Sequence, residues 1–245
     1  MTDNIKDALV YAVGLAGAEE KIILDKDNKQ WYDRDKFNLT ELEEKKYYPS
    51  EINLTTLTSL VDYYYHNLNK ICDETTIVVV RDEQTVVVYT EDDDRKKRSV
   101  LLKVVANVPT FIYDHFYDSE RFNIGMQSKF IDTDHRKLVI DFASKIVLEN
   151  TKDIEDTGVG QVTTIKNGPA SLAKAQAPNP VNLKPYRTFQ EVEQPSSDFI
   201  FRLNKQGELA LFESDGGKWR IEAMQSIANY LRDALIQFEH VTVLA

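Results

Sequence analysis

The chain has 245 residues, of which 42% are hydrophobic and 10% aromatic, a composition typical of a folded protein with a sizeable core. It carries 30 basic and 40 acidic residues, which give a formal net charge of -10. This balance argues against binding of duplex DNA, because such binding requires clustered lysine and arginine side chains.

Cysteine usage and apolar runs indicate the compartment. The single cysteine, Cys72, can form neither an intrachain disulfide nor a zinc site built from cysteines, which fits a reducing cytoplasm. The first residues are polar and show no secretory signal pattern. The longest apolar run, 100–105, is interrupted by Lys103 and is far shorter than the roughly 20 residues that span a bilayer. We therefore expect a cytoplasmic protein that does not enter a membrane.

The N-terminal part of the sequence has helical patterning. Apolar residues at helical spacing predict helices over 3–16 and about 55–71. Between them, Ile22 to Leu24 fit a short strand and residues 39–46 fit a helical turn. We interpret residues 1–74 as a helical N-terminal segment that precedes the core.

The remainder, residues 75–245, is predicted to form an α+β core. Runs of β-branched residues predict three consecutive antiparallel strands over 75–82, 85–92 and 99–108. Helices are expected near 120–130 and over 133–149, and the small residues of 168–181 favour an exposed loop or arm. The later expected elements are a short strand between glycine-containing turns within 157–168, strands at 181–192, 197–203 and 208–215, and a hairpin turn at 204–207. They are followed by a helix with Ile221, Met224, Ile227, Ala228, Leu231 and Leu235 on one face, and by an edge strand at 241–245. The fold class is therefore α+β, with mainly antiparallel sheets and packed helices.

The segment ESDGGKW, residues 213–219, with Arg220 directly after it, is the first candidate ligand site. Two glycines precede a helix, and backbone N–H groups at a helix start attract anions. Gly216, Gly217, Lys218 and Arg220 are the residues that would hold such a ligand. The alternative interpretation is a tight loop that needs glycine for its backbone angles.

Arg187 is a second ligand-binding candidate, because the segment KPYRTF places it between Tyr186 and Phe189. Aromatic rings and a guanidinium can clamp a nucleotide or a peptide. An ordinary exposed strand entry is the alternative.

Asp132, Asp134 and His135 form a third constellation. Carboxylates and imidazole can bind a divalent metal, but acidic residues are also typical of a solvated helix start, which we favour. The sequence contains no phosphate-binding, serine-hydrolase or zinc-protease motif. We therefore predict no catalytic residue, no metal and no cofactor.

Three segments carry a resemblance to a known family. They read TGVGQVTTIKNGPASLA, APNPVNLKPYRTFQEVEQPSSDFIFRL and ALFESDGGKW. In their order they resemble an uncharacterised tailed-phage and prophage family of the YfdQ-like type, over residues 100–236. The resemblance implies a phage or prophage origin and action in the cytoplasm of an infected bacterium. It implies no active site.

Three functions follow as hypotheses. We favour a non-enzymatic accessory protein that binds a host or defence component, either a protein or a small nucleotide ligand. The alternatives are an accessory protein of phage DNA replication or recombination, and an unrecognised nucleotide-handling enzyme. We also expect a homo-oligomer, because the valine runs 78–80 and 86–88 make strands apolar on both faces.

Overall fold

The computed structural model of the chain describes residues 22–24, 30–33, 39–41, 48–92, 96–146, 155–156, 161–166 and 172–245. Contacts divide the chain into two units, Met1–Tyr48 and Pro49–Ala245. The division lies upstream of residue 74, the boundary predicted from the sequence.

Unit 1 contains a small antiparallel sheet. Its strands are β1 (Ile22–Leu24), β2 (Gln30–Asp33) and β3 (Leu39–Glu41). The strand predicted at Ile22 is confirmed. The helical turn predicted from residue 39 is wrong at its start, because Leu39–Glu41 pair with β2. The helix predicted over 3–16 lies outside the described residues.

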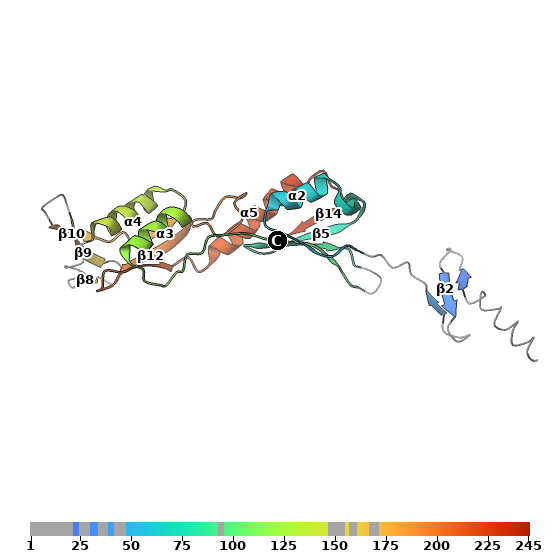
Figure 1. Ribbon diagram of the computed structural model, residues 1–245, viewed down its shortest axis with the longest axis horizontal. Coiled ribbons are helices and arrows are strands. Elements are labelled where there is room, and N and C mark those ends of the chain that lie inside the picture. The colour runs from blue at the N-terminus through green and yellow to red at the C-terminus, as the bar shows by residue number, and fades with distance from the viewer. Residues whose placement is uncertain are drawn as a thin grey trace, which may run out of the picture. The chain divides into compact units, whose positions relative to one another are not determined.

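Unit 2 folds as two lobes (Figure 1). The first, which we call the sheet lobe, comprises the described residues of 49–105 and residues 218–245. Its five-stranded sheet has the order β14-β5-β6-β7-β4. The bounds are β4 (Ile52–Leu54), β5 (Thr76–Asp82), β6 (Thr85–Thr90), β7 (Val100–Val105) and β14 (Val241–Leu244). The three consecutive antiparallel strands predicted between 75 and 108 are confirmed, and the edge strands β4 and β14 add in parallel.

Two helices, α2 (Leu57–Tyr65) and α5 (Lys218–Ala234), cover one face of this sheet (Figure 1). Alternate strand residues, including Val78 and Val86, are fully buried beneath them. Helix α5 begins where the sequence predicts, but Ile221 is exposed and Trp219 is buried in the core. The sequence predicted that the second helix would continue to Ile71. It ends earlier, because Asn67 has a left-handed backbone and a 3₁₀ turn, η2 (Leu68–Asp73), follows.

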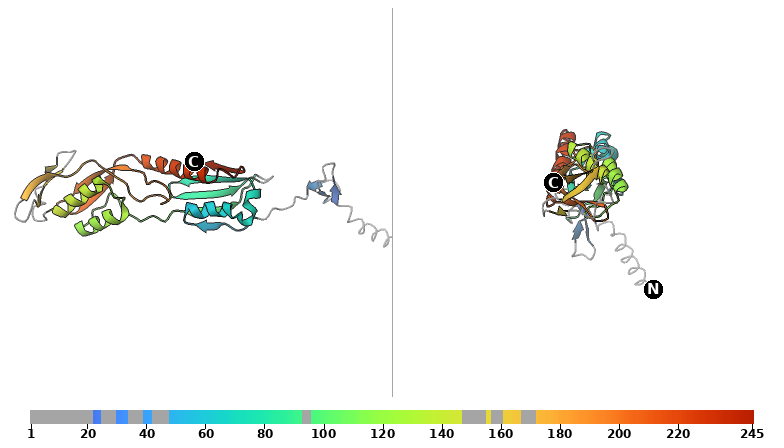
Figure 2. Two further views of the ribbon diagram at one scale, coloured as in Figure 1. Left: turned by 90° about the horizontal axis from the view of Figure 1, so that it is seen from above. Right: turned by 90° about the vertical axis from the view of Figure 1, so that its left-hand side faces the viewer.

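The second lobe, which we call the hairpin lobe, comprises the described residues between 111 and 213. Its three-stranded antiparallel sheet contains β11 (Val181–Leu183), β12 (Ser197–Leu203) and β13 (Leu209–Glu213). Helices α3 (Ser119–Lys129) and α4 (Asp134–Lys145) pack in the same lobe, which Figure 2 shows from above. Large buried side chains form the core, among them Phe122, Met126, Phe130, Phe199 and Phe201. The chain passes between the lobes at residues 106–110 and 214–217.

A second small sheet corrects one prediction. Strands β8 (Glu155–Asp156), β9 (Gln161–Lys166) and β10 (Leu172–Gln176) pair antiparallel. Leu172–Gln176 pair with β9 and so form a strand where a loop or arm was predicted, and Ala177 and Val181, within the range 168–181, are buried. Pairing with a neighbouring strand outweighs the weak strand propensity of this alanine-rich segment.

The chain combines helices with mainly antiparallel sheets, and the predicted α+β class is confirmed. Among the described helices, none has both the length and the apolar character needed to cross a bilayer.

Candidate functional site

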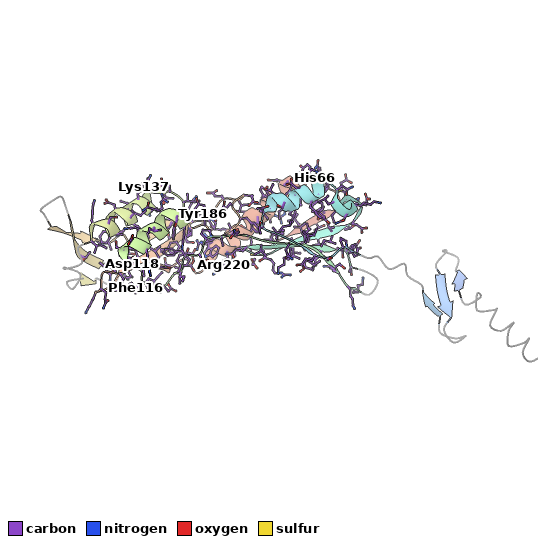
Figure 3. All side chains as sticks on the ribbon, in the orientation of Figure 1. His66, Phe116, Asp118, Lys137, Tyr186 and Arg220 are labelled. Carbon is purple, nitrogen blue, oxygen red and sulfur yellow. The ribbon has the colours of Figure 1, made fainter. Side chains whose placement is uncertain are left out.

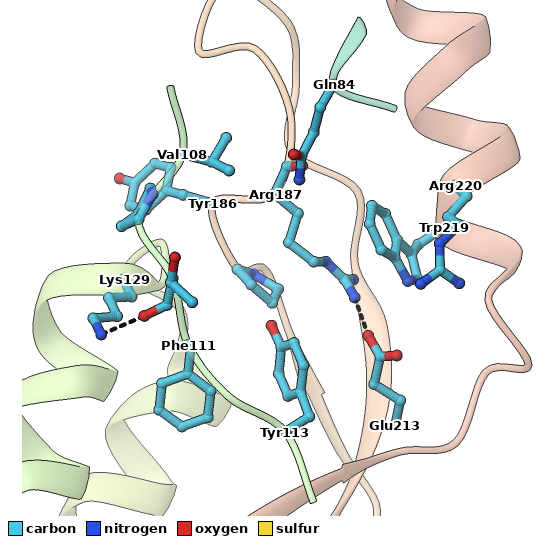
Figure 4. A pocket seen from close by; sticks show the side chains of 13 residues that line it. Gln84, Val108, Phe111, Tyr113, Lys129, Tyr186, Arg187, Glu213, Trp219 and Arg220 are labelled. Atoms are coloured by element: carbon cyan, nitrogen blue, oxygen red, sulfur yellow. Dashed lines mark hydrogen bonds and ion pairs between the residues drawn. The ribbon is translucent and has the colours of Figure 1, made fainter. Parts of the chain in front are cut away.

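A cavity of about 250 Å³ lies in unit 2 where the sheet lobe meets the hairpin lobe (Figure 4). Tyr186 and Arg220 mark its place between the lobes (Figure 3). Side chains from both lobes and from the crossing at 106–110 form the wall. The lining residues are Gln84, Val108, Pro109, Thr110, Phe111, Tyr113, Lys129, Pro185, Tyr186, Arg187, Glu213, Trp219 and Arg220.

The charge of the wall is opposite to that of the chain. Lys129, Arg187 and Arg220 are cations, whereas Glu213 is the one carboxylate among the described lining residues. Glu83, beside the cavity, pairs with Arg220 at 3.3 Å between Oε1 and Nε. A cationic wall in a chain of net charge -10 concentrates a positive field at this junction and favours an anionic ligand.

Arg187 is the most buried of these cations, at 5% exposure. Its Nη1 lies 2.7 Å from Oε1 of Glu213, and Nη2 donates to the hydroxyl of Ser197. Its guanidinium carbon lies 3.9 Å from the centroid of the Trp219 ring. Burial lowers the pKa of Arg187 from its ordinary value, and the charges of Glu213 and Asp215 oppose that shift.

The backbone around Arg187 is fixed by a buried glutamine. Oε1 of Gln194 accepts from the backbone N–H groups of Arg187 and Thr188 at 2.9 and 3.2 Å. Its Nε2 donates to the carbonyl of Phe189 at 2.8 Å. From the sheet lobe, Nε2 of Gln84 donates to the carbonyl of Arg187 at 3.1 Å. The guanidinium therefore projects from a loop that both lobes hold.

Trp219 and Arg220 come from the first turn of α5. The guanidinium carbon of Arg220 lies 4.8 Å from the Trp219 ring centroid. In the view of Figure 4 the indole lies between the guanidinium groups of Arg187 and Arg220. Cations stack favourably on an indole, so Trp219 holds the two positive groups in one wall.

Two buried donors of this wall have no acceptor. Within the described part of the chain, neither Nε of Arg187 nor Nε1 of Trp219 has a hydrogen-bond partner. Trp219 is 4% exposed, so bulk water does not satisfy its N–H group. Buried donors are almost always paired, so these two N–H groups are exceptions in the packing behind the cavity wall.

The predicted anion turn at Gly216 and Gly217 instead holds a carboxylate of the chain itself. Oδ1 of Asp215 accepts from the N–H of Gly217 at 2.9 Å, and Oδ2 accepts from the hydroxyl of Ser197 at 2.5 Å. Burial would raise the pKa of Asp215, but these hydrogen bonds and the charge of Arg187 outweigh burial and lower it. Both glycines have positive φ values, as the tight-loop interpretation requires.

The five ligand-binding candidates thus separate into two groups. Arg187 and Arg220 both line the cavity, although they are far apart in the sequence. Gly216, Gly217 and Lys218 are not among its lining residues, and Lys218 pairs with Glu222 at 3.3 Å. Lys129 and Tyr113 also line the cavity, but they were not predicted as site residues, because neither lies in one of the candidate motifs of the sequence.

The constellation predicted as the alternative metal site makes other contacts. Asp132 pairs with Arg136 at 2.8 Å, and Asp134 pairs with Lys137 at 3.6 Å. Nδ1 of His135 accepts from the backbone N–H of Asn182 at 3.0 Å. Among the described residues, no group of three or more His, Cys, Asp or Glu side chains is placed to hold a metal ion.

Comparisons of the chain with protein-family models, with curated proteins and with solved structures gave no match.

Proposed function

We propose that the chain is a non-enzymatic binding protein whose inter-lobe cavity takes a small anionic ligand. The observation that carries the proposal is the convergence of three cations, Lys129, Arg187 and Arg220, on a cavity in which Glu213 is the one carboxylate among the described lining residues. A phosphate or carboxylate group would supply negative charge and acceptor oxygens to these cations.

The size of the cavity limits the ligand. A volume of about 250 Å³ is below the roughly 300–1,000 Å³ of pockets for drug-sized ligands. Rings of Phe111, Tyr113, Tyr186 and Trp219 line it and supply apolar faces for a planar group. These features support a compact anion with one planar part, such as a mononucleotide, and they support the small-nucleotide form of the accessory function.

The chemistry of the wall supports binding over catalysis. Glu213 is tied to Arg187 by an ion pair, and burial raises the pKa of the Tyr113 hydroxyl far above neutral pH. The Tyr113 hydroxyl is therefore not suited to act as a general base at neutral pH. The enzyme alternative predicts release of phosphate from a nucleoside triphosphate by the purified protein, which the binding proposal does not.

Calorimetric titration with adenosine monophosphate and with inorganic phosphate tests the binding proposal. We expect Arg220→Gln to weaken binding about tenfold, since one charge-assisted hydrogen bond is lost. Lys218→Gln is the matched control, because it removes an exposed cation two residues away that does not line the cavity. Equal affinities of the two variants, or absence of binding by the natural chain, would overturn the proposal.

The biological setting belongs to the same proposal. The resemblance described above favours a phage-encoded protein that acts in the bacterial cytoplasm on a host or defence component, as a homo-oligomer. Mass spectrometry of small molecules released from the natural chain and from the Arg220→Gln variant, both purified from a bacterial host, would identify the ligand. A phosphorylated molecule released by the natural chain alone is the expected result, and identical profiles would contradict it.

A further inference from the structure

The free edge of strand β14 has the backbone pattern of a self-pairing surface. Thr76 N–H donates to the carbonyl of His240 at 2.9 Å. Backbone groups of a strand point alternately to its two sides, so His240, Thr242 and Leu244 face β5. Val241 and Val243 therefore direct their backbone groups toward the outer edge of the sheet.

This edge is less protected than the opposite one. Strand β14 reads Val-Thr-Val-Leu, with no charge, proline or bulge, and Leu244 is 49% exposed. The opposite edge strand, β4, has three residues and follows Pro49 and the exposed Glu51. Charges, prolines and short length are the devices that prevent edge pairing. In the described part of the chain, no strand pairs with the outer side of β14.

We infer that β14 is a dimer interface, in which the strand pairs antiparallel with β14 of a second copy of the chain. A two-fold axis at Thr242 would place Val243 opposite Val241 of the second copy. The Val243 N–H of each copy would then donate to the Val241 carbonyl of the other. Val241 N–H already donates to the carbonyl of Phe238 at 3.2 Å, so the Val243 groups provide the two donors of the seam.

A second copy fits this edge because the pattern is self-complementary. The strand offers a free donor at Val243 and a free acceptor at Val241, and a two-fold axis matches one to the other. Across the axis, Thr242 would lie opposite Thr242, a pair that is favourable between strands. The seam is short and buries less area than the roughly 1,200 Å² of stable interfaces, so the dimer is expected to depend on protein concentration.

The inference deepens the proposed homo-oligomer and is independent of ligand binding. Sedimentation across a wide concentration range measures it in the full chain. We expect the average mass of the natural chain to rise from 28.2 kDa toward twice that value. Val243→Pro removes only an outward N–H group and should remain at 28.2 kDa at every concentration. The control Val243→Thr keeps the N–H group and should still dimerise.

A charge exchange tests the register without changing the backbone. Thr242→Lys and Thr242→Glu each place like charges opposite one another across the axis, and each variant alone should be monomeric. An equimolar mixture of the two should restore the dimer, whereas Gln225→Lys, at an exposed position of α5, should behave as the natural chain does.

The outcomes separate the two proposals. A natural chain that is monomeric at all concentrations overturns both the β14 dimer and the homo-oligomer. Association that persists equally in Val243→Pro and in Thr242→Lys leaves an oligomer built on another surface and overturns the β14 seam. If Val243→Pro fails to fold, as judged by circular dichroism, the variants Thr242→Lys and Thr242→Glu test the β14 seam in its place.

Discussion

The guanidinium of Arg187 and the indole of Trp219 are stacked, with 3.9 Å between the guanidinium carbon and the ring centroid. One residue comes from the hairpin lobe and the other from the start of α5, so the contact joins the two lobes. Arg187 is also paired with Glu213 at 2.7 Å, and its side chain is only 6% exposed. The stack and the ion pair together make Arg187 a structural residue as well as a ligand candidate.

Replacement of Arg187 by methionine should destabilise the fold by about 3 kcal/mol, because it leaves the partly buried Glu213 carboxylate without its partner. Lys184→Met is a matched control. Lys184 forms an ion pair of the same 2.7 Å length with Glu193, but Glu193 is 79% exposed. Loss of an exposed pair should change stability by less than ~1 kcal/mol. Urea denaturation measures both variants, and equal losses would show that burial of the Arg187 pair does not matter.

Tyr64 should make the fold sensitive to alkali. Burial raises the pKa of its hydroxyl to about 12, despite a hydrogen bond of 2.8 Å with Thr76. Because this pKa lies above the unfolded-state value of about 10, the contribution to stability is complete below pH 10. It is lost as the pH rises toward 12, by up to about 3 kcal/mol.

The measurement is the free energy of unfolding as a function of pH for the natural chain and for Tyr64→Phe. At pH 8 the variant should be less stable, because the Thr76 hydroxyl loses its partner. Between pH 10 and 12 its stability should fall less steeply than that of the natural chain. Parallel curves over this range would contradict the assignment to Tyr64.

The strands of the sheet lobe could be predicted from sequence because their signal is local. The β-branched runs of β5, β6 and β7 are rich enough to specify strands without knowledge of their neighbours. The strand over Leu172–Gln176 could not be predicted in this way, because its residues have weak strand propensity and its pairing partner, β9, supplies the hydrogen bonds.

Other features of the fold depend on side-chain amides that form the backbone hydrogen bonds a neighbouring strand would otherwise form. Asn179 exchanges two hydrogen bonds with the backbone of Phe201, at 2.6 and 2.9 Å. Gln161 does the same with Leu203, at 2.8 and 3.1 Å. These amides extend the pairing of β12, and neither residue type at these positions has a sequence signal that would predict such a role.

The candidate site was also predictable only in part, because its residues come from segments that are distant in the sequence. Arg187 stands between aromatic residues in the sequence, and Arg220 follows the glycine turn at a helix start, so both residues were predicted as ligand candidates. Their common cavity depends on the fold, which also brings Lys129 and Gln84 to it. The sequence of the glycine turn is compatible with a bound anion, and an anion site was therefore predicted there. In the structure, the carboxylate of Asp215 accepts the hydrogen bond from the Gly217 N–H group, and the sequence does not show where that carboxylate points.

Asp215 should contribute to stability at neutral pH and lose that contribution in acid. Its pKa is lowered in the folded chain, so the ionised form stabilises the fold above the unfolded-state pKa, and this stabilisation disappears as the pH falls through the folded-state pKa. Asp215→Asn should therefore be less stable than the natural chain at pH 7, with a smaller difference near pH 3. Asp134→Asn is the control, since that side chain is 94% exposed. A stability difference for Asp215→Asn that is independent of pH would contradict the prediction.

Gly217 and Gly216 provide a paired test of the wall geometry. Both have positive φ values, so alanine at either position should destabilise the fold by about 1 kcal/mol. A Cβ at Gly217 would also lie 2.7 Å from Nη1 of Arg220, whereas a Cβ at Gly216 would meet nothing within 4 Å. Gly217→Ala should therefore displace the Arg220 guanidinium from the Trp219 ring, and Gly216→Ala should not.

Trp219 itself reports the displacement. The chain has 2 tryptophans, so Trp31→Phe leaves Trp219 as the single indole. In that background we expect Gly217→Ala to change the tryptophan emission and to weaken adenosine monophosphate binding, because Arg220 no longer lines the cavity in the same position. Gly216→Ala should retain both properties at a similar loss of stability. If both glycine variants alter emission and binding to the same extent, the effect comes from backbone strain at the start of α5, and the position of Arg220 has no separate role.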